Sequence, residues 1–129
     1  MRKNNLILDK SFDFAVRIVN LNKHLVFEKK EYVLSKQILR SGTAIGALVR
    51  EAQHAESPAD FIHKFSIALK EANETEYWLL LLYETNYLNK NQFDSLKNDI
   101  EELLKILVTI VKNTKQKTRN RHENKNTKQ

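Results

Sequence analysis

The sequence predicts an all-α protein: an up-down-up-down antiparallel four-helix bundle with a disordered basic C-terminal tail. Three observations support this fold class. Four segments show helical periodicity, and three of them repeat apolar or small residues at alternating three- and four-residue steps, the pattern of helices packed nearly parallel or antiparallel. The 129 residues include only two Gly and one Pro, too few for the many turns of a β-sandwich or barrel. The connections between the segments are short, so successive helices should be antiparallel neighbours.

The first predicted helix starts near Asp9 or Ser11, since either side chain can cap it, and ends near Phe27. Four polar residues recur at steps of four, three and four, so they form one stripe along the helix. Most other positions are apolar, which predicts a wide buried face. The polar stripe consists of Asp13, Arg17, Asn20 and His24.

The second predicted helix covers about residues 32–55, with apolar or small residues in phase from Leu34 to Ala52. Gly42 and Gly46 lie at its centre. Each interior Gly costs a helix roughly 1 kcal/mol relative to Ala. Close approach of a neighbouring helix would offset this cost, and we favour it because the stripe continues in phase on both sides. The alternative is a local kink or break.

The third predicted helix has a strong start signal, with Ser57 as the cap, Pro58 at the first helical position and Asp60 at the third. It should run to about Thr85. The fourth predicted helix begins near Asn91, and its seam alternates three- and four-residue steps without a miss. That seam consists of Phe93, Leu96, Ile100, Leu103, Leu107 and Ile110.

Two stretches contain more apolar surface than one seam can bury. Residues 77–83 read Tyr-Trp-Leu-Leu-Leu-Leu-Tyr and cover every face of two helical turns, and residues 106–111 nearly do the same. Because a bundle helix normally keeps a polar outer face, this excess predicts a partner surface, most simply a second copy of the chain. In the alternative, residues 5–8 shield a well-covered core. The candidate oligomer and packing residues are Gly42, Gly46, Tyr77, Trp78 and Leu81.

The net charge of +6 is concentrated at the C-terminus. Residues 1–112 contain 16 Lys and Arg against 15 Asp and Glu, whereas residues 113–129 contain six against one and no aliphatic or aromatic side chain. We therefore divide the chain into a bundle domain, 1–112, and a disordered basic tail, 113–129, because burial cannot offset the entropy of ordering such a tail. The tail can bind RNA or DNA phosphates, or act only as a solubilising terminus. The candidate nucleic-acid contacts are Lys115, Lys117, Arg119, Arg121, Lys125 and Lys128.

No arrangement of residues predicts an enzyme, a bound metal or a cofactor. The chain has no Cys, which excludes a disulfide scaffold, a Cys-ligated zinc site and a thiol nucleophile. Two acid-x-x-His pairs lie at one end of the predicted bundle, and such pairs occur in di-iron bundles. Helix one offers no inward acid to complete that set, so solvated His residues are favoured over a metal site. The two pairs are Glu51 with His54 and Asp60 with His63.

Folding the second and third helices about residue 57 places Arg40 opposite Glu74, with Glu71 one turn away. We expect a structural ion pair among these three residues. The functional alternative is a catalytic carboxylate pair.

No apolar run approaches the roughly 20 residues that span a bilayer. The longest apolar run near the N-terminus, Leu6-Ile7-Leu8, is shorter than the about 7–15 apolar residues of a signal peptide. We therefore expect a cytoplasmic protein with no membrane partner.

Four motifs together resemble one protein family. They are Ser11–Val19, Glu31–Thr43, Ile67–Ala72 and Glu74–Leu79. The chain resembles the bacterial four-helix-bundle proteins first noticed as open reading frames in intervening sequences of 23S ribosomal RNA genes. The resemblance implies a homopentamer with no known catalytic activity. The family is also similar to the accessory protein of diversity-generating retroelements, a basic pentameric bundle that works with a reverse transcriptase and nucleic acid.

The second helix departs from the family pattern, since Ala44 and Leu48 replace polar residues. This change favours a drier helix contact. The leading hypothesis is a non-enzymatic homo-oligomer, a pentamer, that binds RNA or DNA backbones without sequence specificity. The alternative is a protein–protein adaptor that recruits a reverse transcriptase or another partner, with the tail incidental.

Overall fold

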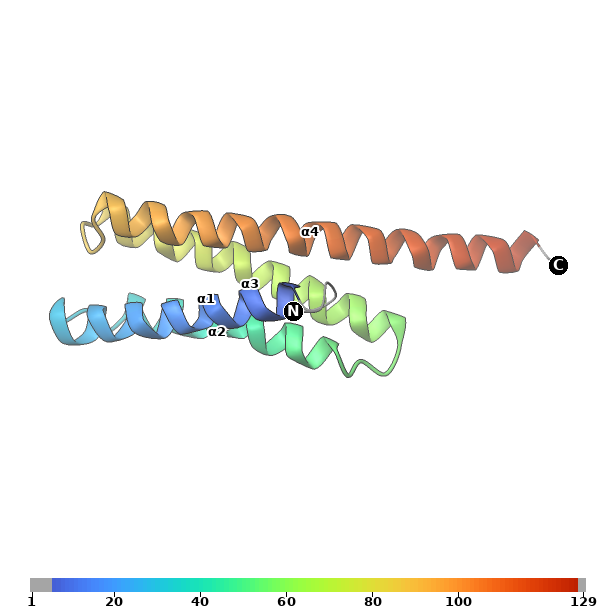
Figure 1. Cartoon of the computed structure of the whole chain (residues 1–129), viewed down its shortest axis with the longest axis horizontal. Coiled ribbons are helices and arrows are strands. Elements are labelled where there is room, and N and C mark those ends of the chain that lie inside the picture. Colours follow the sequence, from blue (N-terminus) through green and yellow to red (C-terminus); the bar gives the residue numbers. More distant parts are fainter. Residues whose placement is uncertain (1–5, 128–129) are drawn as a thin grey trace.

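A computed structural model of the chain describes residues 6–127, with side chains for residues 6–124 (Figure 1). The described part contains no β-strand. Its elements are α1 (Leu6–Lys23), the π-helical turn η2 (His24–Glu28), α2 (Leu34–Ala52), α3 (Pro58–Glu84) and α4 (Lys90–Thr127).

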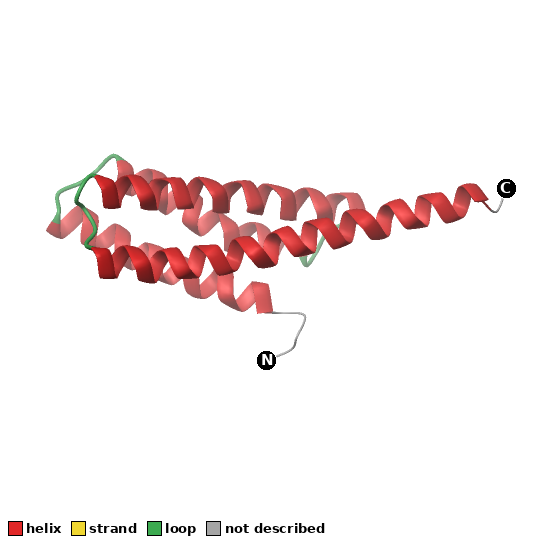
Figure 2. Ribbon diagram, turned by 90° about the horizontal axis from the view of Figure 1, so that it is seen from above, coloured by secondary structure: helices red, strands yellow, loops and turns green. Residues whose placement is uncertain are grey.

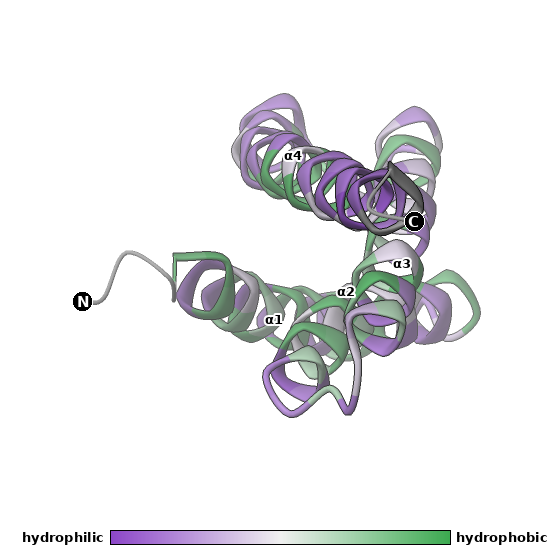
Figure 3. Cartoon of the chain, turned by 90° about the vertical axis from the view of Figure 1, so that its right-hand side faces the viewer, coloured by the Kyte–Doolittle hydropathy of each residue, from purple (hydrophilic) through white to green (hydrophobic). Residues whose placement is uncertain are grey.

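The helices run up, down, up and down, as predicted. Figure 2 shows the α1–α2 and α3–α4 connections at one end of the bundle and the α2–α3 connection towards the other. Viewed end-on, α1, α2, α3 and α4 follow one another around an open arc (Figure 3). Sequential helices pack closely, whereas α1 and α4 contact each other much less. The predicted bundle is therefore confirmed, with its weakest seam between the first and last helices. No helix within residues 6–127 is both long and apolar enough to cross a membrane.

The core consists of the apolar seams that the periodicity predicts. In α4, the seam is buried from Phe93 to Leu107, and Ile110 packs partly buried against it. All four helices contribute fully buried side chains, because each presents one apolar stripe inward. The largest of these are Phe14, Ile18, Leu25, Ile38, Ile45, Phe65, Leu79, Leu82, Ile100, Leu103 and Leu107.

A buried carboxylate caps the start of α2. Glu31 Oε1 accepts a hydrogen bond from the Ser35 amide at 2.7 Å, and Oε2 accepts from the Leu34 and Val33 amides at 3.1 and 3.2 Å. These amides have no partner inside the helix, and the positive end of the helix dipole favours a nearby anion. This role of Glu31 was not predicted from the sequence.

Replacing Glu31 with Ala should lower the free energy of unfolding by about 2–3 kcal/mol, because three amides lose their acceptor together. Urea unfolding followed by circular dichroism measures the change. Glu28→Ala is the matched control, since Glu28 is an exposed acid three residues earlier, at the end of η2. Equal effects of the two substitutions would contradict the capping role.

The start of α3 is capped as predicted, and α4 starts slightly earlier than predicted. Ser57 Oγ accepts from the Asp60 amide at 3.0 Å, with Pro58 at the first helical position. At α4, Asn89 and Gln92 exchange hydrogen bonds between their side-chain oxygens and each other's amides, at 2.8 and 2.9 Å. This capping box starts α4 at Lys90, one residue before the predicted position.

The prediction of a disordered C-terminal tail is wrong. Instead of ending near residue 112, α4 continues as a helix to Thr127. Every side chain from Lys115 to Asn124 is exposed, so the segment buries no core, as its composition indicates. It contains no Gly or Pro, and residues such as Lys, Arg and Gln extend a helix readily once it is nucleated. Residue 112 therefore marks the end of the apolar seam and not the end of the helix.

Candidate functional site

Gly42 and Gly46 face α1 at a close helix approach. A Cβ atom at Gly42 would lie 2.8 Å from Cγ1 of Ile18, and one at Gly46 would lie 3.2 Å from the carbonyl oxygen of Ser11. α2 runs through both glycines without a break. The two residues thus belong to the α1–α2 contact inside one chain, where only a hydrogen atom fits at Gly42 and a Cβ atom at Gly46 would be tight.

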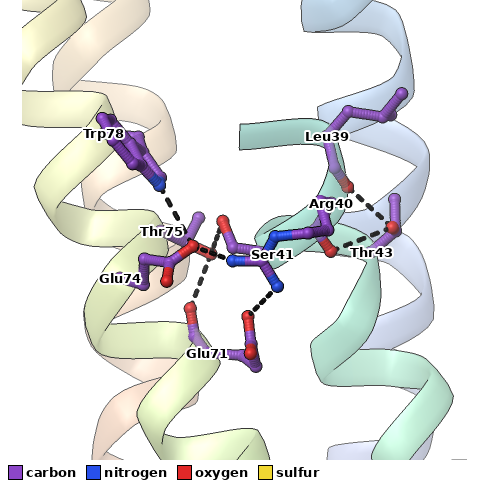
Figure 4. A network of polar contacts seen from close by, with 8 residues as sticks. All are labelled: Leu39, Arg40, Ser41, Thr43, Glu71, Glu74, Thr75 and Trp78. Carbon is purple, nitrogen blue, oxygen red and sulfur yellow. Dashed lines mark hydrogen bonds and ion pairs between the residues drawn. The ribbon is translucent and has the colours of Figure 1, made fainter. Parts of the chain in front are cut away.

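The other side of α2 contacts α3 through a polar network (Figure 4). Thr75 Oγ1 lies 2.9 Å from Ser41 Oγ, and both side chains are fully buried. Beside this pair, Arg40 donates to Glu71 Oε2 at 3.0 Å and also to Glu74 Oε2. The network ties the two helices together at mid-length.

The same network contains Trp78, whose Nε1 donates to Glu74 Oε2 at 3.2 Å. Burial alone would lower the pKa of Arg40, but Glu71 and Glu74 outweigh that effect and raise it, so the guanidinium stays charged. Both carboxylates are engaged by this cation, which is the arrangement of the expected ion pair. The sequence predicted only packing for Trp78, and its hydrogen bond to Glu74 was not predicted.

The two acid-x-x-His pairs lie near the α2–α3 connection. Glu51 forms an ion pair with Lys64 at 3.4 Å. Asp60 Oδ2 accepts a hydrogen bond from the Glu56 amide at 3.2 Å. Within residues 6–127, no group of three or more His, Cys, Asp or Glu side chains is placed to hold a metal ion. His54 and His63 are both exposed.

Ion pairs hold the open edge between α1 and α4. Lys10 pairs with Glu102 at 2.6 Å, and Arg17 pairs with Asp99 at 2.5 Å. Arg17 also donates to Ser95 Oγ at 2.9 Å. The hydrogen bond to Glu102 raises the pKa of Lys10. Part of the polar stripe of α1 therefore faces α4 instead of solvent.

As a result, α1 presents apolar residues on its outside. Phe12, Val16 and Val19 are 59%, 46% and 38% exposed. Their spacing of four and three puts them on one face, which we call the α1 outer face. The sequence could not distinguish this stripe from a core seam, because both have the same spacing.

A second apolar surface lies on α3. Tyr77 and Leu80 are 58% and 48% exposed, while Trp78 and Leu81 are half-buried. Tyr77, Leu80 and Leu81 form what we call the α3 outer face. Of the predicted oligomer residues, Tyr77 and Leu81 thus lie on an outer surface.

The helical extension of α4, residues 113–127, projects beyond the rest of the bundle (Figures 1 and 2). The predicted contacts Lys115, Lys117, Arg119 and Arg121 are all exposed on it. Lys117 and Arg121 line hollows beside the α2–α3 connection, whereas Lys115 lies two residues away on the opposite side of the helix. The side chain of Lys125 and all of Lys128 lie outside the described residues.

Comparisons with known proteins agree with this fold. The chain matches the 23S rRNA-intervening sequence proteins over residues 3–109. It is similar to a crystal structure of a protein of unknown function from the S23 ribosomal protein family of Bacteroides thetaiotaomicron. The two are 61% identical, the match covers 86% of this chain and 99% of that chain, and the TM-score is 0.84. No match was found among curated proteins. The chain therefore belongs to the 23S rRNA-intervening sequence protein family.

Proposed function

We propose that this protein is a non-enzymatic homo-oligomer, a pentamer, whose basic helical extensions bind RNA or DNA backbones without sequence specificity. The main support is that α4 extends beyond the other helices of the bundle. This extension exposes Lys115, Lys117, Arg119 and Arg121. Lys and Arg that neutralise phosphates release counterions, and this favours binding to any sequence.

The charge distribution supports placing this function on the extension. Residues 1–112 have nearly balanced charges, whereas residues 113–129 contain six Lys and Arg against one acid. In a pentamer, five extensions would act together, and linked weak sites bind much more tightly than single ones.

The positions of the apolar surfaces support a ring. The α1 outer face and the α3 outer face belong to different helices of the open arc (Figure 3). Contact between unlike faces of two copies is head-to-tail, and such contacts close into rings when the rotation permits. The number five comes from the family resemblance.

Deleting residues 113–129 should abolish most nucleic-acid binding. We expect the affinity for a labelled single-stranded RNA to fall at least about ten-fold at about 50 mM salt, and the salt dependence to become much shallower, since fewer phosphates are neutralised. Fluorescence anisotropy across about 50–200 mM salt measures both quantities. Sedimentation of the shortened chain controls for loss of assembly. Absence of binding by the full chain at low salt would overturn the proposal.

A second candidate function is an adaptor that recruits a reverse transcriptase or another protein. It is favoured by an apolar cluster at the α1–α2 connection, where Phe27, Tyr32 and Val33 are 67%, 54% and 70% exposed. Replacing Phe27 and Val33 with Ser should then reduce protein capture from nuclease-treated native lysate. Unchanged capture by this variant would count against the adaptor function.

A further inference from the structure

We propose that the α4 extension and the α2–α3 connection form a groove that binds single-stranded nucleic acid, with a base against Phe61 and phosphates on Lys117 and Arg121. This inference rests on the proposed nucleic-acid function and assigns it a site and a strand preference. The groove wall formed by Lys117 and Arg121 lies beyond the residues that match the family, which end at 109.

The groove consists of two adjoining hollows with volumes of about 520 and 540 Å³. Each is within the range of about 300–1,000 Å³ that small ligands occupy. One hollow follows the α2–α3 connection, and the other lies between the start of α1, α3 and α4. They adjoin each other, since both are lined by Gln53, Phe61, Thr114 and Lys117.

The lining of the groove is apolar on its floor and basic on one wall. The Phe61 ring lies 4.7 Å from the Phe65 ring, tilted by 44°, and is only partly buried. Lys117 and Arg121 supply the basic wall, and these two cations outnumber the one acid in the lining, Glu56. The apolar floor consists of Leu6, Ile7, Phe61, Phe65, Ile106 and Ile110.

This lining complements a ligand with a flat apolar part joined to an anion. A nucleotide has this chemistry, since its base can stack on an aromatic ring while its phosphate pairs with a cation. The hydroxyl groups of Thr114 and Thr118 already donate to the Ile110 and Thr114 carbonyl oxygens, so their oxygens can only accept hydrogen bonds from a base or sugar. The amide oxygen of Gln53 offers a further acceptor. Stacking tolerates every base, which agrees with binding that does not read sequence.

The geometry favours a single strand over a duplex. In a duplex the bases are stacked on each other inside the helix, and their flat faces are not available to Phe61. In a single strand the bases can splay outward and stack on protein side chains. A duplex can still contact the exposed cations of the extension through its backbone. The groove therefore supplies the preference for single strands, while the cations supply affinity for both forms.

The α4 extension provides a matched internal control. Lys117 and Arg121 are four residues apart and line the groove, whereas Lys115 and Arg119 have the same spacing on the opposite side of the same helix. Replacing either pair with Gln removes the same charge from the same helix. Only the replacement of Lys117 and Arg121 should weaken single-strand binding by more than the loss of charge alone explains.

The test uses the full chain and a fluorescein-labelled oligouridine of about 12 nucleotides, with a duplex of equal length as comparison. We expect K117Q/R121Q to weaken oligouridine binding about ten-fold more than K115Q/R119Q, while both pairs weaken duplex binding equally. Phe61→Leu keeps an apolar side chain but removes the ring. It should weaken oligouridine binding about five-fold or more and leave duplex binding and the salt dependence unchanged.

Each remaining outcome overturns a defined part of the proposal. If K117Q/R121Q and K115Q/R119Q weaken oligouridine binding equally and Phe61→Leu has no effect, the extension acts only through its charge. The proposed function then stands without the groove. If duplex binding depends on the groove pair as strongly as oligouridine binding does, the single-strand preference is wrong. If polyglutamate displaces oligouridine at equal charge, the groove selects acidic chains and not nucleotides. If the full chain binds neither nucleic acid, the proposed function itself fails. Circular dichroism and sedimentation confirm that each variant folds and assembles.

Discussion

Replacing Val16 with Glu should dissociate the proposed oligomer into chains of 15.2 kDa while the bundle stays folded. Val16 lies at the centre of the α1 outer face and is 46% exposed, so a carboxylate there can remain hydrated in a single chain. In an assembly that covers this face, the carboxylate would be buried without a cation, which costs several kcal/mol at every interface. Sedimentation velocity measures the change in mass, and circular dichroism checks the helix content.

Val108→Glu is the matched control for this substitution. Val108 is 48% exposed and lies on α4, outside both the α1 and the α3 outer faces. The same change at the same exposure should therefore leave the assembly intact. A native protein that sediments as a monomer, or a Val16→Glu variant that keeps the native mass, would contradict the assembly proposal.

Mixing two variants tests whether unlike faces meet. Tyr77→Glu should also yield monomers, because it places a charge on the α3 outer face. A Val16→Glu chain retains an intact α3 face, and a Tyr77→Glu chain retains an intact α1 face. Their mixture should form a heterodimer and no larger species, because only one good contact remains. An interface between two like faces predicts instead that one of the variants assembles by itself.

Most of the fold was predictable because it depends on local sequence patterns. The three- and four-residue steps identify the α4 seam from Phe93 to Leu107, and the α3 cap at Ser57 follows from side chains three residues apart. Pattern alone shows which residues share a face, but not which face is inside. That is why the α1 outer face and the α1–α4 ion pairs needed the tertiary structure.

Two features escaped prediction for different physical reasons. The helical extension was expected to be disordered because it cannot bury apolar surface, yet an existing helix can be propagated without burial. The groove brings together Phe61 and Lys117, which are far apart in the chain. A signal that pointed to it was the spacing of Lys117 and Arg121 in phase with Ile110, which continues the inner stripe of α4 as a basic one.

Gly42→Leu should lower the free energy of unfolding by about 3 kcal/mol or more, despite the better helix propensity of Leu. Propensity alone predicts a gain of roughly 1 kcal/mol from removing an interior Gly. Packing opposes this gain, because a Cβ atom at Gly42 would lie 2.8 Å from Ile18 Cγ1. Ile18 is fully buried between helices, so it has no open space to move into.

Ala47→Leu provides the comparison that separates packing from propensity. Ala47 is exposed on the same helix, so the substitution there should change the free energy of unfolding by less than about 0.5 kcal/mol. Urea unfolding at one fixed protein concentration measures both variants, since the proposed assembly would also contribute to stability. Equal stabilities would mean that α1 and α2 can separate at Gly42 without loss. The contact between Gly42 and Ile18 argues against this, because any separation there also breaks the packing of Gly46 on Ser11.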